Sequence, residues 1–467
     1  MAYSFFIQMR MELVITGLIF LLLFFKLGKP VSNEVVLTVV SIALLLTTSL
    51  SFFGEQEGRQ FAGMFVTNPL MFLQKSLLAG AVYLICLLNY DWLRKQEHLA
   101  EFFILMLSAL LGMFLMISSG NLLMFYLSLE LSSIPVAALA NFELQKRTSS
   151  EAGMKMILSS AFASGILLFG ISLVYGSTGT IQFASLPAQL QAGDTLQIVA
   201  YILFFTGFAF KLSVVPFHFW TADVYEGAPV PVASFLSVVS KGAVAFIFMN
   251  IVMKVFLPLG NITYHLLTIL AIATIIVGNL FAVRQKNLKR FLAFSSIAQV
   301  GFILVGVLNG STLGIAAVVY FVLVYLFSNL AAFGVVSVIT NATGKESIDD
   351  YKGLYKNNKL LGWVMAIALF SLAGIPPTAG FFGKLFLIMA GATQASLGFI
   401  VIVALNLVVS LFYYLRVVRA IFMDNNEQPL EKVNYSSVVK LGMIICLAGI
   451  VLTGLIGWIY EYILSIS

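Results

Sequence analysis

Apolar residues dominate the chain along almost its whole length, and only short polar stretches interrupt them. A run of about 20 predominantly apolar residues is long enough to cross the hydrocarbon core of a bilayer as a helix. Such runs, bounded by glycines, prolines, asparagines and charges, predict an all-α polytopic membrane protein with about 14 transmembrane helices. The predicted spans lie near 11–28, 33–53, 66–89, 98–118, 120–142, 152–176, 196–221, 228–256, 261–283, 290–309, 312–340, 360–392, 396–423 and 438–464.

Lysine and arginine are distributed unequally between the connections that join these predicted spans. Of the 26 basic residues, 17 fall in the odd-numbered connections, whereas the even-numbered connections and both termini hold only Arg10, Arg59 and Lys254. Cytoplasmic connections carry an excess of Lys and Arg, and a miscounted span would mix the two sets. The division therefore supports fourteen spans with both termini outside the cytoplasm, on the periplasmic side of a bacterial inner membrane.

The composition agrees with a membrane protein and excludes several other classes. Of the 467 residues, 60% are hydrophobic and only 10% are charged, against about 25% charged in an average soluble domain. The net charge of +6 comes from the connections, so it indicates a cytoplasmic face and no nucleic-acid partner. Cys86 and Cys446 both lie inside apolar runs, which argues against a zinc site, an iron–sulfur centre or a disulfide framework.

Four charged residues lie near the middle of predicted spans, too deep to reach the lipid headgroups easily. They are Lys211, Lys241, Lys384 and Glu130, the one acid in such a position. A charge there costs about 3 kcal/mol on insertion scales, so it faces the protein interior, pairs or lines a hydrated path. A static ion pair between Glu130 and one lysine would leave the other lysines unexplained. We therefore expect a proton relay, because buried lysines load and release protons readily.

Three further lysines lie closer to the ends of their predicted spans. Lys75 and Lys440 are within reach of the interface, so snorkelling of their side chains towards the headgroups accounts for them. Lys155 lies a few residues into the sixth span, close to Glu151. It is either another snorkelling residue or part of an ion path.

Two predicted spans contain proline at membrane depth. Pro216 follows Lys211 in the seventh span, and 376–377 precede Lys384 in the twelfth. Proline breaks a helix, and in lipid the freed backbone groups must be satisfied by protein or water. Broken helices with lysines at matching positions are typical of transporters built from inverted repeats. His218, two residues after Pro216, is either a hydrogen-bonded interior residue or a proton shuttle.

The two predicted broken spans divide the chain into repeated units. Residues 1–96 form an N-terminal segment of three helices, and 97–257 form the first five-helix repeat, spans four to eight. Residues 258–424 form the second, inverted repeat, spans nine to thirteen, and 425–467 hold the fourteenth span. This arrangement places the seventh span opposite the twelfth.

Several long motifs resemble one family of membrane proteins. The stretches 211–241, 287–297 and 373–381 are similar to the antiporter-like subunits of respiratory complex I, the NADH:quinone oxidoreductase. Within that family, 150–155 and 173–179 look like the N-type branch of the bacterial complexes. The length of the chain and the absence of a long C-terminal lateral helix fit that branch and argue against the L-type branch.

The resemblance implies roles for the charged residues by position. Glu130 matches the glutamate of the fifth helix, which in the family pairs with the lysine that Lys211 matches. Lys241 matches the central lysine of the eighth helix, and Lys384 matches the exit-side lysine of the twelfth. Lys155 matches a further lysine of the sixth helix. His218 has no assigned counterpart and stays a secondary candidate.

The resemblance also implies a function and partners, and the sequence departs from the family pattern at one position. It implies a proton-translocating subunit that moves protons from cytoplasm to periplasm, coupled to electron transfer from NADH to quinone in partner subunits. No cofactor is expected in this chain, because NADH, FMN, iron–sulfur clusters and quinone are bound by partner subunits. The expected partners are a peripheral redox arm and, in the membrane, M-type and small K/J/A-type subunits. Gln299 stands where many relatives have a histidine, and glutamine cannot hold a transferable proton. The alternatives are a subunit of a multi-subunit cation/proton antiporter or of a membrane-bound hydrogenase.

Overall fold

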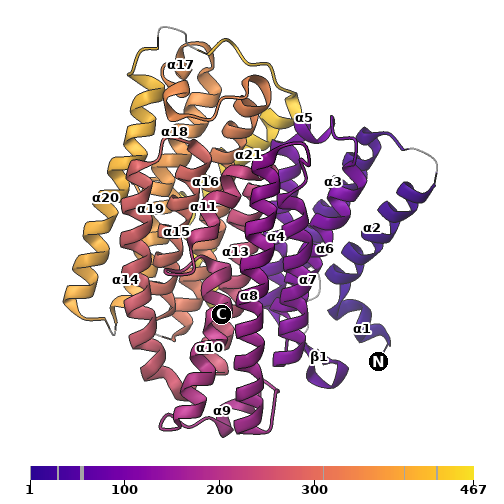
Figure 1. Cartoon of the computed structure of the whole chain (residues 1–467), viewed down its shortest axis with the longest axis vertical. Coiled ribbons are helices and arrows are strands. Elements are labelled where there is room, and N and C mark those ends of the chain that lie inside the picture. Colours follow the sequence, from indigo (N-terminus) through magenta and orange to yellow (C-terminus); the bar gives the residue numbers. More distant parts are fainter. Residues whose placement is uncertain (1, 29–30, 53–56, 309, 394, 427–429) are drawn as a thin grey trace.

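The computed structural model forms an elongated bundle of helices (Figure 1). It describes the whole chain except residues 1, 29–30, 53–56, 309, 394 and 427–429. Helices of the first half are α1 (Ala2–Gln8), α2 (Arg10–Leu27), α3 (Asn33–Ser49), α4 (Pro69–Leu88), α5 (Tyr90–Leu93), α6 (Leu99–Ile117), α7 (Leu122–Ala140), α8 (Arg147–Thr178), α9 (Leu186–Gln189), α10 (Thr195–Leu212), α11 (Phe219–Gly227), α12 (Val230–Phe235) and α13 (Lys241–Lys254). Those of the second half are α14 (Gly260–Arg284), α15 (Leu288–Val307), α16 (Thr312–Thr343), α17 (Leu354–Asn357), α18 (Lys359–Ala373), α19 (Ala379–Ala392), α20 (Leu397–Phe422), α21 (Ser437–Leu455) and α22 (Trp458–Ser465).

Each of the fourteen predicted spans corresponds to a helix or to a pair of helices. Within the described residues, twelve helical segments are long and apolar enough to cross a membrane. The remaining two spans are α2, which carries the charged residues Arg10, Glu12 and Lys26, and the pair of shorter apolar helices α18 and α19. The expectation of an all-helical polytopic membrane protein is confirmed.

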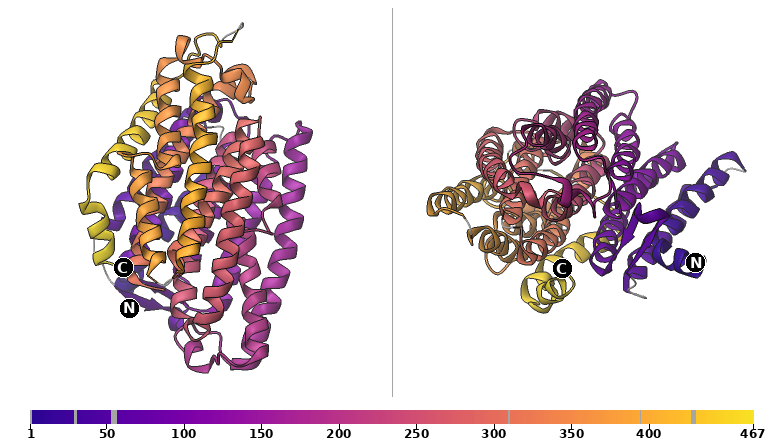
Figure 2. Two further views of the ribbon diagram at one scale, coloured as in Figure 1. Left: turned by 90° about the vertical axis from the view of Figure 1, so that its left-hand side faces the viewer. Right: turned by 90° about the horizontal axis from the view of Figure 1, so that it is seen from below.

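Connections of odd and even number lie at opposite ends of the bundle. In Figure 1 the short helices α5 and α17 lie at the upper end, whereas α9 and β1 lie at the lower end. Both chain termini lie towards the lower end as well (Figure 2). This alternation is what an unbroken count of spans requires, because one missing crossing would move every later connection to the other end.

A small β-hairpin at the lower end is the one element of another kind among the described residues. Strands β1 (Gly58–Gln60) and β2 (Phe65–Thr67) pair antiparallel, with Arg59 opposite Val66. The amide of Gly120 donates to the carbonyl of Met64 over 2.7 Å, which ties the hairpin to the turn between α6 and α7. A Cβ on Gly120 would come within 2.0 Å of the Gly63 carbonyl oxygen, so this close approach requires glycine.

The seventh and twelfth spans are both broken, as the prolines predicted. Helix α10 ends at Leu212 and is followed by Ser213, which has a φ of 64°, and α18 ends at Ala373 and is followed by Gly374, which has a φ of 86°. A cis peptide bond follows each end, between residues 215 and 216 and between residues 376 and 377. In Figure 1 α10 lies below α11, whereas α18 lies above α19, so the two broken spans run in opposite directions.

The segments that carry the mid-span lysines lie inside the bundle. Helices α15 and α16 and the segment of α12 and α13 bury almost all of their residues, whereas α3, α8 and α20 expose apolar side chains on their outer faces. Because the outer faces are apolar, they suit a lipid environment. Polar groups on the buried helices therefore find their hydrogen-bond partners inside the bundle, away from lipid.

Candidate functional site

Lys211 lies in the last turn of α10 and is buried against α7. Its Nζ donates a hydrogen bond to the Oγ of Ser133, three residues after Glu130 on α7. Glu130 is half-buried, and its Oε1 has no hydrogen-bond partner among the described residues. The structure brings the acid and the lysine into electrostatic range. Within the described part of the chain, however, no ion pair of 4.0 Å or less joins them, and a neutral serine holds the lysine.

Lys241 occupies the start of α13, directly after a π-helical turn at Leu236–Ser240. Its Nζ donates to the Oγ of Ser296 on α15 over 2.5 Å and lies 5.5 Å from the ring centre of Tyr225. The side chain is only 3% exposed. Such π-helical turns occur often at functional sites, and no feature of the sequence predicted this one.

Lys384 on α19 points at the end of the other half of its broken span. Its Nζ donates to the carbonyl oxygens of Leu372 and Ala373 over 2.6 and 3.2 Å, and it lies 5.0 Å from the ring centre of Phe302. The last carbonyls of a helix lack intrahelical partners and carry the negative end of the helix dipole. The break in the span therefore supplies the lysine with acceptors without a carboxylate.

Gln299 connects this lysine site to α15 and α20. Its Nε2 donates to the Leu372 carbonyl and to the hydroxyl of Tyr414, over 3.0 Å in each case. The same hydroxyl lies 2.5 Å from the Oγ of Ser295. Gln299 and Lys384 thus share one carbonyl acceptor, so glutamine provides a fixed polar link between α15 and the broken twelfth span.

A second polar cluster surrounds Lys241. Ser237, one turn before it, lies 2.9 Å from the hydroxyl of Tyr325 and accepts a hydrogen bond from Asn329 over 2.8 Å. Ser296, the partner of Lys241, is next to Ser295 on α15, and Ser295 belongs to the Gln299 cluster through the hydroxyl of Tyr414. The two clusters form a nearly continuous row of buried polar side chains between the lysines of α13 and α19.

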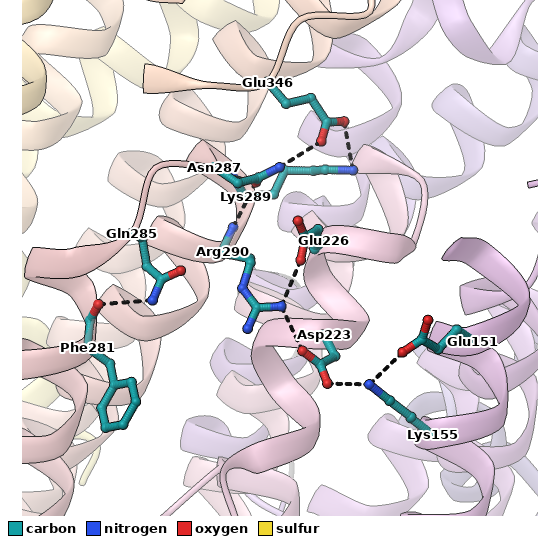
Figure 3. Close-up of polar contacts among 10 residues, drawn as sticks. All are labelled: Glu151, Lys155, Asp223, Glu226, Phe281, Gln285, Asn287, Lys289, Arg290 and Glu346. Carbon is teal, nitrogen blue, oxygen red and sulfur yellow. Dashed lines mark hydrogen bonds and ion pairs between the residues drawn. The ribbon is translucent and has the colours of Figure 1, made fainter. Parts of the chain in front are cut away.

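Lys155 belongs to an ion-pair network near the upper end of the bundle (Figure 3). It lies 2.7 Å from Glu151 and 2.5 Å from Asp223. Asp223 also lies 2.7 Å from Arg290, which pairs with Glu226 over 2.7 Å. The network joins α8, α11 and α15, so it fixes the second half of the broken seventh span. Sequence reasoning left Lys155 undecided, and its partners show that it does not snorkel alone.

The connection between α16 and α18 is fastened to the start of α15 by a second set of polar contacts, also drawn in Figure 3. Glu346 pairs with Lys289 over 2.9 Å and accepts from the side chain of Asn287 over 3.1 Å. Further along this connection Lys352 lies 2.7 Å from Asp349, and its hydrogen bond holds the pKa of that carboxyl below its usual value. These contacts fix the upper end of α15, which carries Ser296 and Gln299.

His218 lies at the break of the seventh span, where α11 begins. It is 5% exposed, its ring lies 4.4 Å from that of Phe219, and its Nδ1 has no hydrogen-bond partner among the described side chains and backbone groups. The structure therefore places His218 near the lysine row but joins it to no other candidate residue.

Lys75 does not snorkel, so the expectation for it was wrong. Its Nζ lies 2.5 Å from Glu12 on α2, and the two side chains are 0% and 2% exposed. The rings of Phe65 and Phe72 lie 5.0 and 5.7 Å from the same nitrogen. Glu12 is thus a second buried acid within a span, which the sequence analysis missed. Lys440 on α21, in contrast, is exposed as expected.

Metal-ligating residues do not gather in the part of the chain that the structure describes. No group of three or more His, Cys, Asp and Glu side chains there could hold a metal ion. Cys86 and Cys446 are both free and buried, on α4 and α21. Apart from the pair of Lys75 with Glu12, the mid-span lysines among the described residues have hydroxyl and carbonyl partners.

Comparisons with known proteins agree with this architecture. Residues 119–411 match the family described as NADH:quinone oxidoreductase/Mrp antiporter, TM. The chain is 44% identical to NADH-quinone oxidoreductase subunit N of Phocaeicola vulgatus, over 97% of both chains. It superposes with a TM-score of 0.81 and 27% identity on a chain of respiratory complex I from Thermus thermophilus with bound aureothin, covering 95% of this chain and 98% of that one.

A more distant likeness shows how widely the fold is used. A chain of the Mrp complex from Dietzia shares it with a TM-score of 0.83 at 21% identity, covering 98% of this chain and 96% of that one. That likeness concerns the fold alone. The match at 44% identity is to a subunit N and so identifies the branch within the family. The chain therefore belongs to the family of antiporter-like membrane subunits of NADH:quinone oxidoreductase, in its subunit N branch.

Proposed function

We propose that this chain is a proton-translocating module of respiratory complex I in which Lys211, Lys241 and Lys384 hold the proton in turn. The observation that carries the proposal is that three lysines of three different helical segments are almost completely buried, each with neutral partners. A purely structural role would pair each charge with an acid, because an unpaired charge in the interior is costly.

The partners of the first two lysines suit a group that changes its charge. A serine hydroxyl accepts a hydrogen bond from an ammonium group and donates one to a neutral amine. Ser296 therefore satisfies Lys241 both with and without the transferred proton. Ser133 donates to the Leu129 carbonyl, so it accepts from the charged Lys211 and must turn away from that carbonyl to serve the neutral amine. Main-chain carbonyls accept only, and those at a helix end favour a cation. Lys384 is thus the position at which the protonated form is best stabilised by the backbone.

Glu130 supplies the control of the first step. In the structure Lys211 is held by Ser133, one turn of α7 from Glu130. A shift of the lysine onto the carboxylate would stabilise its charged form by about 4 kcal/mol at 4 Å and an effective dielectric constant of 20. Movement of Lys211 between serine and glutamate therefore changes its proton affinity enough to load and discharge it.

The direction of transport and the partners follow from charge placement and family membership. We propose that the lysine- and arginine-rich upper end faces the bacterial cytoplasm and that both termini are periplasmic, in the inner membrane. Protons then move from the upper to the lower end, through repeats at 97–257 and 258–424. Partner subunits bind NADH, FMN, iron–sulfur clusters and quinone, and M-type and small K/J/A-type subunits are the membrane neighbours. Lys155 and His218 serve as secondary groups beside the lysine row.

Proton pumping by the assembled complex tests this proposal. Lys211→Ala and Glu130→Gln should each abolish most of the NADH-driven pH gradient in inverted membrane vesicles while native gels still show the assembled complex. Lys440→Ala removes an exposed lysine of another span and serves as the matched control. Unchanged proton-to-electron stoichiometry in both variants would exclude the relay. A gradient that requires Na⁺ would instead favour cation/proton antiport.

A further inference from the structure

A cavity of about 490 Å³ opens at the lower end of the bundle, away from the lysine row. Its walls come from the β-hairpin, the start of α4, the turn between α6 and α7, the connection at 182–187 and the last turns of α13. Main-chain hydrogen bonds join three of these walls: Gly120 donates to Met64, and Phe183 donates to Gly120 over 3.0 Å. The cavity is therefore a built feature of the fold.

Two cationic side chains reach this cavity from different elements. Arg59 comes from β1 and Lys254 from the last residue of α13, and both are exposed. They are two of the three basic residues that depart from the charge bias between the two ends of the bundle. Neither forms an ion pair with any described acid. Their meeting in one cavity brings two of these three basic residues to the same place at the lower end.

A buried amide in the same cavity lacks an acceptor. Asn250 is 8% exposed, lines the cavity, and its Nδ2 has no hydrogen-bond partner among the described residues. A buried donor left unsatisfied costs roughly 1–3 kcal/mol. Asn250 and Lys254 are four residues apart on α13, so they lie on one face of the helix. The amide and the ammonium group therefore present donors to the same space.

One side of the cavity is apolar and is formed by Val66, Met71, Ile247, Ile251 and Val255. The other side also carries polar residues, namely Asn68, Ser119, Gln182 and Ser185. The isoleucines of α13 continue the stripe of Asn250 and Lys254 along the helix, and Val255 follows directly after its last residue. Cationic donors next to an apolar wall at the end of a membrane helix match a ligand that has a phosphate group and an attached hydrocarbon chain.

We propose that this cavity binds an anionic phospholipid, with the phosphate held by Arg59, Lys254 and the Asn250 amide. One acyl chain lies along the apolar wall between α4 and α13. Free inorganic phosphate offers the same anionic oxygens, but it leaves the apolar wall without a partner. The site is separate from the proposed proton path, since the hydrogen-bond and ring partners of Lys211, Lys241 and Lys384 among the described residues do not line it.

The test uses the purified complex in vesicles of phosphatidylcholine that contain a small fraction of photoactivatable phosphatidylglycerol. After illumination, peptide mapping should place crosslinks in 59–71 and 247–255. The double variant Arg59→Gln/Lys254→Gln should reduce these crosslinks by at least about fivefold, the effect of removing one cation near an anionic lipid surface. Asn250→Leu should also reduce them, whereas Lys146→Gln, an exposed lysine at the upper end, should not.

Three outcomes would overturn the proposal. Crosslinks that are equally strong in the double variant would show that the cations do not select the lipid. Loss of the crosslinks in excess inorganic phosphate would assign the cavity to a free anion. Labelling of an acidic segment of a neighbouring subunit, with none in 59–71 or 247–255, would mean that protein fills the cavity. NADH-driven pumping serves only to show that each variant complex is intact.

Discussion

The Nζ of Lys384 lies 2.6 Å from the main-chain carbonyl oxygen of Leu372, at the end of the preceding half-helix. An unbroken twelfth span would use that carbonyl within its own helix, because helical backbone groups bond four residues apart. The break thus has a chemical purpose beyond flexibility. It frees acceptors at the middle of the membrane, where a lysine would otherwise need a buried carboxylate.

Removal of this lysine should stop the last proposed transfer step. We expect Lys384→Ala to slow proton release by about 10² or more, since a positioned proton-transfer group contributes 10²–10⁴ in rate. The measurement is the initial rate of pH-gradient formation per NADH oxidised in inverted vesicles. Lys440→Ala, which removes an exposed lysine of α21, should leave this ratio unchanged. Equal ratios in both variants would remove Lys384 from the path.

Gln299 should be replaceable only by a residue that restores its polar link. Gln299→Leu leaves the Tyr414 hydroxyl and the Leu372 carbonyl with one partner fewer, so pumping should fall while assembly persists. Gln299→His should restore part of the activity and add a titration near pH 6.5 to the pH profile, because histidine ionises there. A pH profile of pumping in the Gln299→His variant that is identical to that of the unmodified complex would contradict a place for Gln299 beside the proton path.

The buried ion pair of Glu12 and Lys75 should couple strongly in a double-mutant cycle. Glu12→Gln or Lys75→Met alone leaves one buried charge without its partner and should destabilise the subunit by about 3–5 kcal/mol. The combined variant removes both charges and should recover part of that loss. Thermal denaturation of the purified complex measures the effect. Additive losses in the double variant would show that the two side chains act independently.

The network around Asp223 should be a stability element of moderate size. Asp223→Asn weakens contacts to Lys155 and Arg290 at once, and we expect a loss of about 1 kcal/mol because the partners are partly exposed. Glu34→Gln, which removes one exposed ion pair with Arg94, should cost less. Thermal denaturation of the two variants measures both losses of stability. Equal midpoints for Asp223→Asn and Glu34→Gln would show that the network contributes no more than one exposed ion pair.

The sequence predicted the architecture well because hydrocarbon thickness and proline chemistry act locally. Every one of the fourteen apolar runs became a membrane helix or a pair of helices, and the seventh and twelfth spans are broken as expected. Pro135, in contrast, lies inside α7 without breaking it. The hairpin at 58–67 was missed, since three-residue strands leave no alternating pattern. The π-helical turn before Lys241 was missed as well, because it depends on the packing of buried helices.

The partners of the buried lysines were harder to predict. Ser133 and Ser296 are ordinary helix residues in sequence, and only the crossing of α7 with α10 and of α13 with α15 brings them to Lys211 and Lys241. The error over Lys75 has the same origin. Its position near a span end suggested snorkelling, whereas its acid lies 63 residues away along the chain. Long-range pairing leaves no trace in local hydropathy.

The pair of Glu12 and Lys75 has a consequence for synthesis of the chain. The ribosome delivers α2 before α4, so Glu12 enters the membrane when its cationic partner does not yet exist. Glu12 lies in the first turn of α2, where an acid stays close to the interface and opposes insertion by less than the ~3 kcal/mol that a charge costs at a helix centre. The N-terminal end of α2 therefore reaches its buried position only when α4 arrives and Lys75 pairs with Glu12. The first three spans become stable together, and the order of translation sets the time at which the N-terminal segment is complete.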